Sequence, residues 1–138
     1  MAYWLVKSEP SSYAWERLAK DGHAHWDGVR NHQAAANLKA MKVGDRAFFY
    51  HSGEGPAVAG IAEIAKTAYP DPSDKTGKFV MVDLKPVTAL KRPVTLADIK
   101  AEPKLKDIAL IRQSRLSVMP IEPAAWKLIC KMGATKPD

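Results

Sequence analysis

Three segments in the early part of the chain each end an apolar or aromatic run abruptly in polar groups. They are residues 4–10 (WLVKSEP), 26–31 (WDGVRN) and 48–52 (FFYHS). Any one alone is typical of a buried strand or turn followed by a loop. The three together indicate a small concave site with an aromatic wall and a few convergent hydrogen-bonding groups. The candidate residues for this site are Lys7, Ser8, Glu9, Trp26, Arg30, Asn31, Tyr50, His51 and Ser52.

Basic residues are concentrated in the second half of the chain. The formal net charge is +6, and residues 85–115 hold eight basic and three acidic side chains, a difference of +5. Excess positive charge favours polyanions such as nucleic-acid phosphates, although a solvated lysine-rich surface has the same composition. Within this segment the residues expected to bind phosphate are Lys106, Arg112, Gln113, Ser114 and Arg115. Arginine can hold phosphate oxygens bidentately, but we also expect at least one of the two arginines, Arg112 and Arg115, to be ion-paired inside the fold.

Length and composition bound the class of protein. At 138 residues and 15.2 kDa, the chain is expected to form one domain with a real core. Its apolar runs are far shorter than a membrane span, and the N-terminus lacks the layout of a signal peptide. We therefore expect a cytoplasmic protein, or a nuclear one in a eukaryotic host. Cys130 is the single cysteine, which excludes an internal disulfide and favours an inert packed thiol.

The pattern along the chain predicts short strands interleaved with short helices, in no regular strand-helix-strand rhythm. Strands are expected at residues 3–7, 46–51, 57–65, 79–90 and 116–121. Helices are expected from residue 11 or 12 to about 20, from 31 or 32 to about 41, and at 95–101, 105–111 and 123–132. Residues 22–30 and 69–74 are predicted to be loops. The mixture favours an α+β fold, with a small, mostly antiparallel, barrel-like sheet and helices at its rim, over a doubly wound sheet.

The chain resembles a known family, the EVE domain, over almost its whole length. The segments that carry the resemblance are WLVKSEP (4–10), WDGVRN (26–31), FYHS (49–52), GIAE (60–63), PDP (70–72) and RQSRLSV (112–118). Several motifs in the same order and spacing make the match specific. The resemblance implies a single PUA-like domain over residues 1–138, a pseudobarrel flanked by helices and related to YTH domains, which read methylated adenine in RNA. It also implies a reader of modified bases, with modified cytosine in DNA as the favoured ligand.

Reading a modified base requires that the base leave its stack, because both of its faces are covered in a duplex. Trp26 is expected to replace that stacking, worth about 1–3 kcal/mol per base, since no helical or strand period places this loop indole in the core. The alternative is a core tryptophan that pins the loop. Asn31 carries the donor and acceptor that a base edge needs, or else caps the helix that follows it. Ser8 and the backbone of residues 7–9 can supply further hydrogen bonds.

Catalysis and metal binding are not predicted. The histidine-rich loop offers the candidate ligands His23, His25, His32 and Asp27. No cysteine pair and no HExxH motif accompanies them, so we expect no metal. Ser8 has no Gly-x-Ser-x-Gly context that would make it a nucleophile.

The sequence therefore predicts a non-enzymatic, cofactor-free module that binds a modified base in nucleic acid, DNA rather than RNA, and acts as a monomer away from membranes. Two alternatives remain open. One is a PUA-like RNA-binding module that reads a modified ribonucleotide, because a pocket for an extruded base serves either backbone. The other is a small hydrolase that uses the same cleft on a nucleotide-like substrate.

Overall fold

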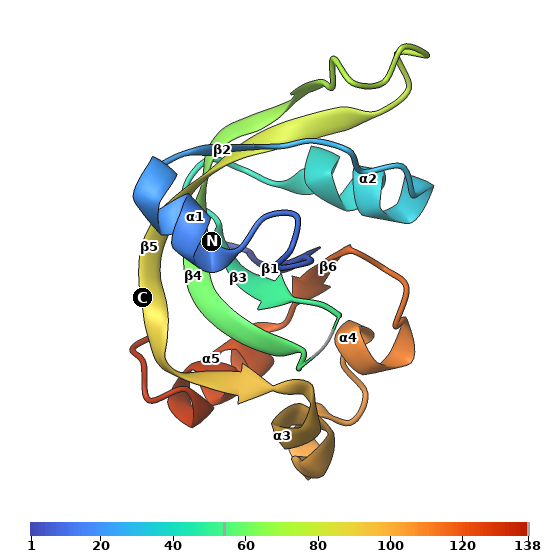
Figure 1. Cartoon of the computed structure of the whole chain (residues 1–138). Coiled ribbons are helices and arrows are strands. Elements are labelled where there is room, and N and C mark those ends of the chain that lie inside the picture. The colour runs from blue at the N-terminus through green and yellow to red at the C-terminus, as the bar shows by residue number, and fades with distance from the viewer. Residues whose placement is uncertain (54, 138) are drawn as a thin grey trace.

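A strongly curved sheet forms the centre of the computed structural model (Figure 1). In the residues that the structure describes, 1–53 and 55–137, the sheet has six strands in the order β2-β5-β4-β3-β1-β6. The strands are β1 (Tyr3–Ser8), β2 (Ala24–Trp26), β3 (Arg46–His51), β4 (Ala57–Pro70), β5 (Val80–Thr95) and β6 (Val118–Ile121). β1 pairs with β3 in parallel, and the other described pairs are antiparallel. The α+β, mostly antiparallel architecture predicted from the sequence is confirmed.

β4 and β5 form a long hairpin that extends beyond the rest of the sheet, at the top of Figure 1. β4 is longer than predicted, because Tyr69 and Pro70 continue its pairing with Met81 and Val80. The loop prediction for residues 69–74 was therefore wrong at its start. Proline is tolerated at this place because it lies at the end of a strand, where a missing N–H costs little.

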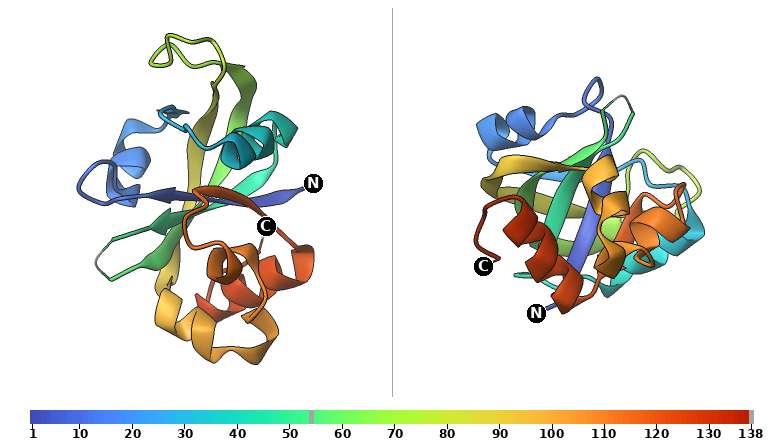
Figure 2. Two further views of the ribbon diagram at one scale, coloured as in Figure 1. Left: turned by 90° about the vertical axis from the view of Figure 1, so that its right-hand side faces the viewer. Right: turned by 90° about the horizontal axis from the view of Figure 1, so that it is seen from below.

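Short helices cover the two ends of the sheet. They are α1 (Trp15–Asp21), α2 (His32–Ala40), α3 (Leu96–Ala101), the 3₁₀ turn η1 (Pro103–Leu105), α4 (Ala109–Arg112) and α5 (Pro123–Met132). Figure 2 shows α3, α4 and α5 gathered at one end, with α1 and α2 at the other. None of the helices in the described residues is long and apolar enough to cross a membrane.

Two helix predictions were wrong in their bounds. The first helix begins at Trp15 instead of residue 11 or 12, because the N–H groups of Ser12 and Tyr13 donate to the carbonyl of Glu9 and form a turn. The helix predicted at 105–111 divides into η1 and α4. α3, by contrast, begins with a reciprocal capping box of Thr95 and Asp98, and Thr95 was the cap that the sequence indicated.

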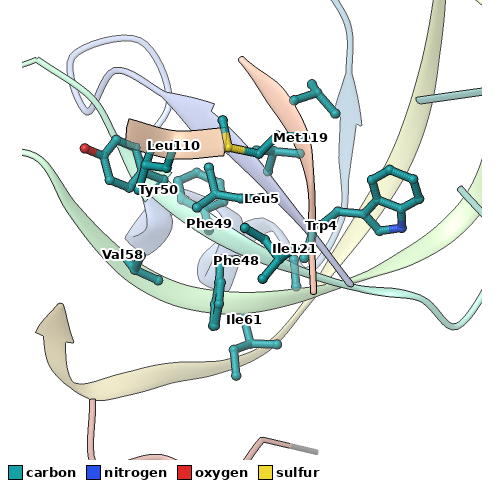
Figure 3. Packing of buried hydrophobic residues seen from close by; sticks show 14 of the residues in the cluster. Trp4, Leu5, Phe48, Phe49, Tyr50, Val58, Ile61, Leu110, Met119 and Ile121 are labelled. Carbon is teal, nitrogen blue, oxygen red and sulfur yellow. The ribbon is translucent and has the colours of Figure 1, made fainter. Parts of the chain in front are cut away.

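Side chains of β3 alternate between two halves of the interior, as the period of a strand requires. Phe48 stacks on Trp126 of α5, with ring centroids 3.9 Å apart. Phe49 points the other way and meets the edges or faces of Trp15 and Trp26, at centroid distances of 5.7 Å and 5.4 Å. In Figure 3, Trp4 likewise points away from the group around Phe48. One strand thus supports both the packing under α5 and the packing under the site described next.

Cys130 is fully buried on α5, in the half of the core that Trp126 fills. Burial raises the pKa of its thiol to about 11. A thiol that stays protonated and enclosed is a weak nucleophile, which agrees with the inert packing role predicted for it.

Candidate functional site

An open cavity of about 680 Å³ lies beside β2, where β1 ends. Most of its lining is one continuous stretch, residues 23–30, which runs through β2 into the segment before α2. The rest of the lining is Lys7, Ser8, Ser12, Tyr13, Asp21 and Ser117. Four of the nine residues predicted for a concave site are therefore brought together here, namely Lys7, Ser8, Trp26 and Arg30.

Trp26 forms part of the cavity wall. The prediction that it lies in a loop was wrong. It ends the three-residue strand β2 and pairs with Val82 of β5. Its side chain packs edge-on against Phe49 and Tyr13, and the residue is only 8% exposed. The indole is therefore both a core residue and a lining residue. Such packing fixes the ring in one orientation, as a rigid stacking surface requires.

Lys7 and Ser8 bring polar groups to the cavity at the end of β1. The Lys7 ammonium donates to the carbonyl of Ser114 over 2.9 Å and lies 5.9 Å from the centre of the Tyr50 ring. Partial burial lowers the pKa of Lys7. The Ser8 hydroxyl donates to the carbonyl of Tyr13 over 2.7 Å. The Lys7 contact joins the cavity to the stretch predicted to bind phosphate.

Asp71 holds the segment from Gly28 to Arg30 in place from the far end of β4. Its buried carboxylate accepts from the Gly28 N–H over 2.8 Å and from an Arg30 guanidinium nitrogen over 3.1 Å. It also accepts from the backbone and hydroxyl of Ser73. Burial alone would raise the pKa of Asp71, but the hydrogen bonds from Ser73, Gly28 and Arg30 outweigh it and lower the pKa to about 2. The carboxylate therefore stays charged and fixes one wall of the cavity.

A second buried carboxylate, Asp83 of β5, lies behind the histidines of the cavity wall. It contacts Nε2 of His23 at 3.0 Å and Nδ1 of His25 at 2.9 Å. The Tyr69 hydroxyl donates to the same carboxylate. Burial raises the pKa of Tyr69, and this hydrogen bond raises it further, to about 12. For Asp83, burial acts to raise the pKa, but the hydrogen bonds from Tyr69, His25 and His23 lower it overall.

Five residues predicted for the site do not line the cavity, and each has another contact. They are Glu9, Asn31, Tyr50, His51 and Ser52. The Glu9 carbonyl closes the turn before α1, and the backbone N–H of Ser52 donates to the carbonyl of Ser8. Tyr50 is buried, because strand alternation turns it to the side of Phe48. These three residues therefore lie close to the cavity along the chain, but their side chains do not line it.

His51 and Asn31 both accept hydrogen bonds from backbone N–H groups at helix starts. Nε2 of His51 accepts from the N–H of Trp15 over 3.0 Å, and burial lowers the pKa of this imidazole. The side-chain oxygen Oδ1 of Asn31 accepts from the N–H of Ala34 over 2.9 Å and caps α2. The cap was the alternative that the sequence left open for Asn31.

The residues predicted to bind phosphate are all exposed, one directly after η1 and the others at the end of α4 and just beyond it. They are Lys106, Arg112, Gln113, Ser114 and Arg115. Over the described residues, neither arginine forms an ion pair, so the expected internal ion pair was wrong for both. The described ion pairs of arginines with residues distant in sequence are instead Arg30 with Asp71 and Arg46 with Glu63. Both arginines of this stretch are thus available to a polyanion.

Among the residues that shape the cavity and that sequence reasoning missed are Tyr13, Asp71 and Asp83. Two signals could have found the aspartates. Asp83 interrupts the apolar run 80–84, and a charge inside a buried strand needs partners. Asp71 lies between two prolines with Ser73 two residues on, which is typical of a side-chain-to-backbone turn. Nothing local marks Tyr13 as a lining residue.

Comparisons with known proteins agree on one family. The family model of the EVE domain matches residues 2–132. Mouse thymocyte nuclear protein 1 is 36% identical over 170 residues, covering 99% of this chain and 75% of the mouse protein. A solved structure from Rhodopseudomonas palustris has a TM-score of 0.92 and 57% identity, covering 97% of this chain and 94% of that chain. The human THYN1 protein, solved in complex with 5-methylcytosine containing DNA, has a TM-score of 0.91 and 33% identity, covering 99% and 100%.

The YTH domain of the Zygosaccharomyces rouxii MRB1 protein, solved in complex with N6-methyladenosine RNA, also matches, with a TM-score of 0.62 and 18% identity. At this identity the likeness concerns the fold alone, and it confirms the architectural relation to YTH domains that the sequence motifs implied. The family-model match and the identity to the mouse protein reach far beyond a shared architecture. This chain belongs to the EVE domain family.

Proposed function

We propose that this protein is a non-enzymatic module that binds a modified nucleobase, with modified cytosine in DNA as its ligand, in the cavity beside Trp26. The observation that carries the proposal is the joint presence, in one cavity of about 680 Å³, of the Trp26 ring and the polar end of β1. This volume falls in the range of small-ligand sites, which combine apolar walls with a few placed polar groups. An extruded base needs both a stacking surface and hydrogen-bonding partners.

The groups in the cavity suit the two parts of such a ligand. Trp26 offers a ring that Phe49 and Tyr13 hold in place, so little side-chain entropy is lost when a base stacks on it. Lys7 lies between the cavity and the carbonyl of Ser114, which belongs to the exposed basic stretch. A nucleotide in the cavity would thus place its backbone beside Arg112 and Arg115, which can hold phosphates without reading sequence.

The favoured ligand follows from a relative. The human THYN1 protein, whose fold this chain shares at 33% identity, is solved in complex with 5-methylcytosine containing DNA. We carry this ligand class to the present chain because the similarity spans 99% of it. A modified ribonucleotide remains the rival ligand, and the binding experiment below separates the two.

The contacts of Ser8 and His51 support a binding role over catalysis. The Ser8 hydroxyl donates to the Tyr13 carbonyl, and Nε2 of His51 accepts from the backbone of Trp15. Each group is therefore engaged in holding the fold, instead of forming a nucleophile–base pair with the other. We also propose that residues 1–138 act as one domain and as a monomer. We place the protein in the cytoplasm, or in the nucleus of a eukaryotic host, as the name of the relative thymocyte nuclear protein 1 suggests for that protein.

A panel of matched oligonucleotides tests the ligand class. The panel contains DNA and RNA of one sequence, single- and double-stranded, with unmodified cytosine, 5-methylcytosine, 5-hydroxymethylcytosine or N6-methyladenine. We expect the tightest binding for a DNA with modified cytosine, measured by fluorescence anisotropy. Equal affinity for modified and unmodified strands would overturn base reading, and preference for a methylated RNA would establish the rival ligand.

Two tryptophan variants test whether the cavity is the site. Trp26→Leu keeps an apolar side chain but removes the stacking ring, and should weaken binding of the modified oligonucleotide by about 5- to 150-fold, equivalent to about 1–3 kcal/mol. Trp15→Leu is the matched control, because Trp15 is also buried and packs on Phe49 but does not line the cavity. Similar losses of affinity in both variants at matched stability would exclude Trp26 as the stacking surface.

A further inference from the structure

Two histidines and a buried aspartate lie together at the wall of the cavity. His25 belongs to β2 and is paired in register with Asp83 of β5. His23 is two residues earlier, on the same side of the extended chain. Nε2 of His23, Nδ1 of His25 and the Asp83 carboxylate all lie within 4.8 Å of one another. The three donors therefore converge on one point although Asp83 is 58 residues from His25 in sequence.

The spacing and chemistry of these donors match a known ligand set. Ligands about 2.0–2.1 Å from one Zn²⁺ ion are about 3.0–3.4 Å from each other at right or tetrahedral angles. The nitrogen–oxygen distances here are 3.0 Å for His23 and 2.9 Å for His25. Two imidazoles and one carboxylate suit borderline ions such as Zn²⁺ and Co²⁺, and suit Mg²⁺ poorly.

The surroundings of the cluster provide both support and access. Asp83 is buried and accepts a hydrogen bond from Tyr69, which is the kind of outer contact that orients a carboxylate ligand. The histidine side chains are 47% and 62% exposed and both line the cavity, whereas Asp83 lies behind them. An ion held by three protein ligands would keep its remaining coordination positions toward the cavity.

We propose that His23, His25 and Asp83 form a binding site for a divalent transition-metal ion, Zn²⁺ in the first place, with an open coordination position that faces the cavity. Two of these ligands, His23 and His25, were among the candidates that the sequence offered, but the others, His32 and Asp27, are not part of the cluster. His32 lies on α2 with its ring 5.0 Å from that of Phe79. The third ligand comes from β5, through strand pairing.

Titration of untagged, chelator-treated protein with ZnCl₂ alone tests the site by calorimetry and by thermal melting. We expect one ion per chain, a rise in the melting temperature that excess EDTA reverses, and no such rise with MgCl₂. Co²⁺ should give the visible absorption bands of a four- or five-coordinate ion. The absence of saturable binding would overturn the proposal, and because no nucleic acid is present, that result would leave the proposed function standing.

Single variants locate the ion. His23→Gln and His25→Gln should each weaken Zn²⁺ binding at least about tenfold, and Tyr69→Phe by about 10- to 100-fold through its hold on the carboxylate. Both histidines are largely exposed, so these variants should fold, as their melting without metal would verify. His32→Gln is the matched control and should bind like the wild type. Binding that survives in both His23→Gln and His25→Gln would place the ion elsewhere and refute this site.

Discussion

The side chain of Asn31 has a structural role, which is to cap a helix. Its carbonyl oxygen caps α2 at the N–H of Ala34, so Asn31→Ala should destabilise the protein by about 1 kcal/mol. Asn31→Asp keeps a capping oxygen and should retain most of that stability. Urea denaturation of both variants measures the difference. Equal stability of Asn31→Ala and wild type would deny the cap, and lost base discrimination in a stable Asn31→Asp would give the amide a role in the site.

Gly60 is the residue whose lack of a side chain lets α1 approach the sheet. A Cβ atom built on Gly60 would lie 2.6 Å from the ring of Trp15. Gly60→Ala should therefore force the indole or β4 to shift and cost about 1–3 kcal/mol, as overpacking does. Thermal denaturation measures the loss, and the double variant Gly60→Ala with Trp15→Leu should recover part of it. A stable Gly60→Ala would mean that the ring moves freely.

The sequence predicted residue roles best where the signal was local. Thr95 was identified as a helix cap, because capping depends on residues a few positions apart. Trp26 was placed in a loop, because a strand of three residues is too short to show a period of two and depends on pairing with Val82. The contacts of Asp83 with His23 and His25, and of Asp71 with Gly28 and Arg30, were not predicted, because these partners are distant along the chain. Local chemistry can be read from the sequence, but convergence depends on the fold.

At the scale of elements, the pairing of the β4–β5 hairpin with β2 builds the cavity wall. The predicted strands at residues 46–51 and 116–121 correspond closely to β3 and β6, because their apolar runs have clear boundaries. The extension of the hairpin was not predicted, since the prolines around residue 71 indicate a loop. The same extension carries Asp71 to the segment after β2. The end of the β4–β5 hairpin, which was not predicted from the sequence, therefore positions one side of the site.

The Asp71 contact makes this link between elements dependent on pH. Its folded-state pKa of about 2 lies below the ordinary 3.8, so its stabilising effect is present above pH 4 and is lost as the pH falls to about 2. The shift corresponds to about 2 kcal/mol. The difference in unfolding free energy between wild type and Asp71→Asn should therefore shrink by about that amount between pH 5 and pH 2. Parallel stability curves for the two proteins would contradict it.

At the scale of the whole molecule, the excess charge predicts how binding responds to salt. If residues 85–115 face the phosphates, the logarithm of the affinity should fall linearly with that of salt concentration, by about 0.7–0.9 per phosphate neutralised. Arg115→Gln and Lys106→Gln should each weaken modified and unmodified oligonucleotides alike and make the slope shallower. Lys131→Gln, an equal charge change on α5, is the control and should leave the slope unchanged. A loss confined to modified strands would assign these side chains to base reading.

The alternation of Phe48 and Phe49 along β3 has an optical consequence. It separates Trp126, which stacks on Phe48, from Trp15 and Trp26, which contact Phe49. Of the four tryptophans, which include Trp4, Trp26 alone lines the cavity among the described residues, so an occupant would quench one emitter and leave the other three fluorescent. Intrinsic fluorescence should then fall to a plateau well above zero as the cavity fills. The protein thus contains both an indicator of occupancy and its own internal reference.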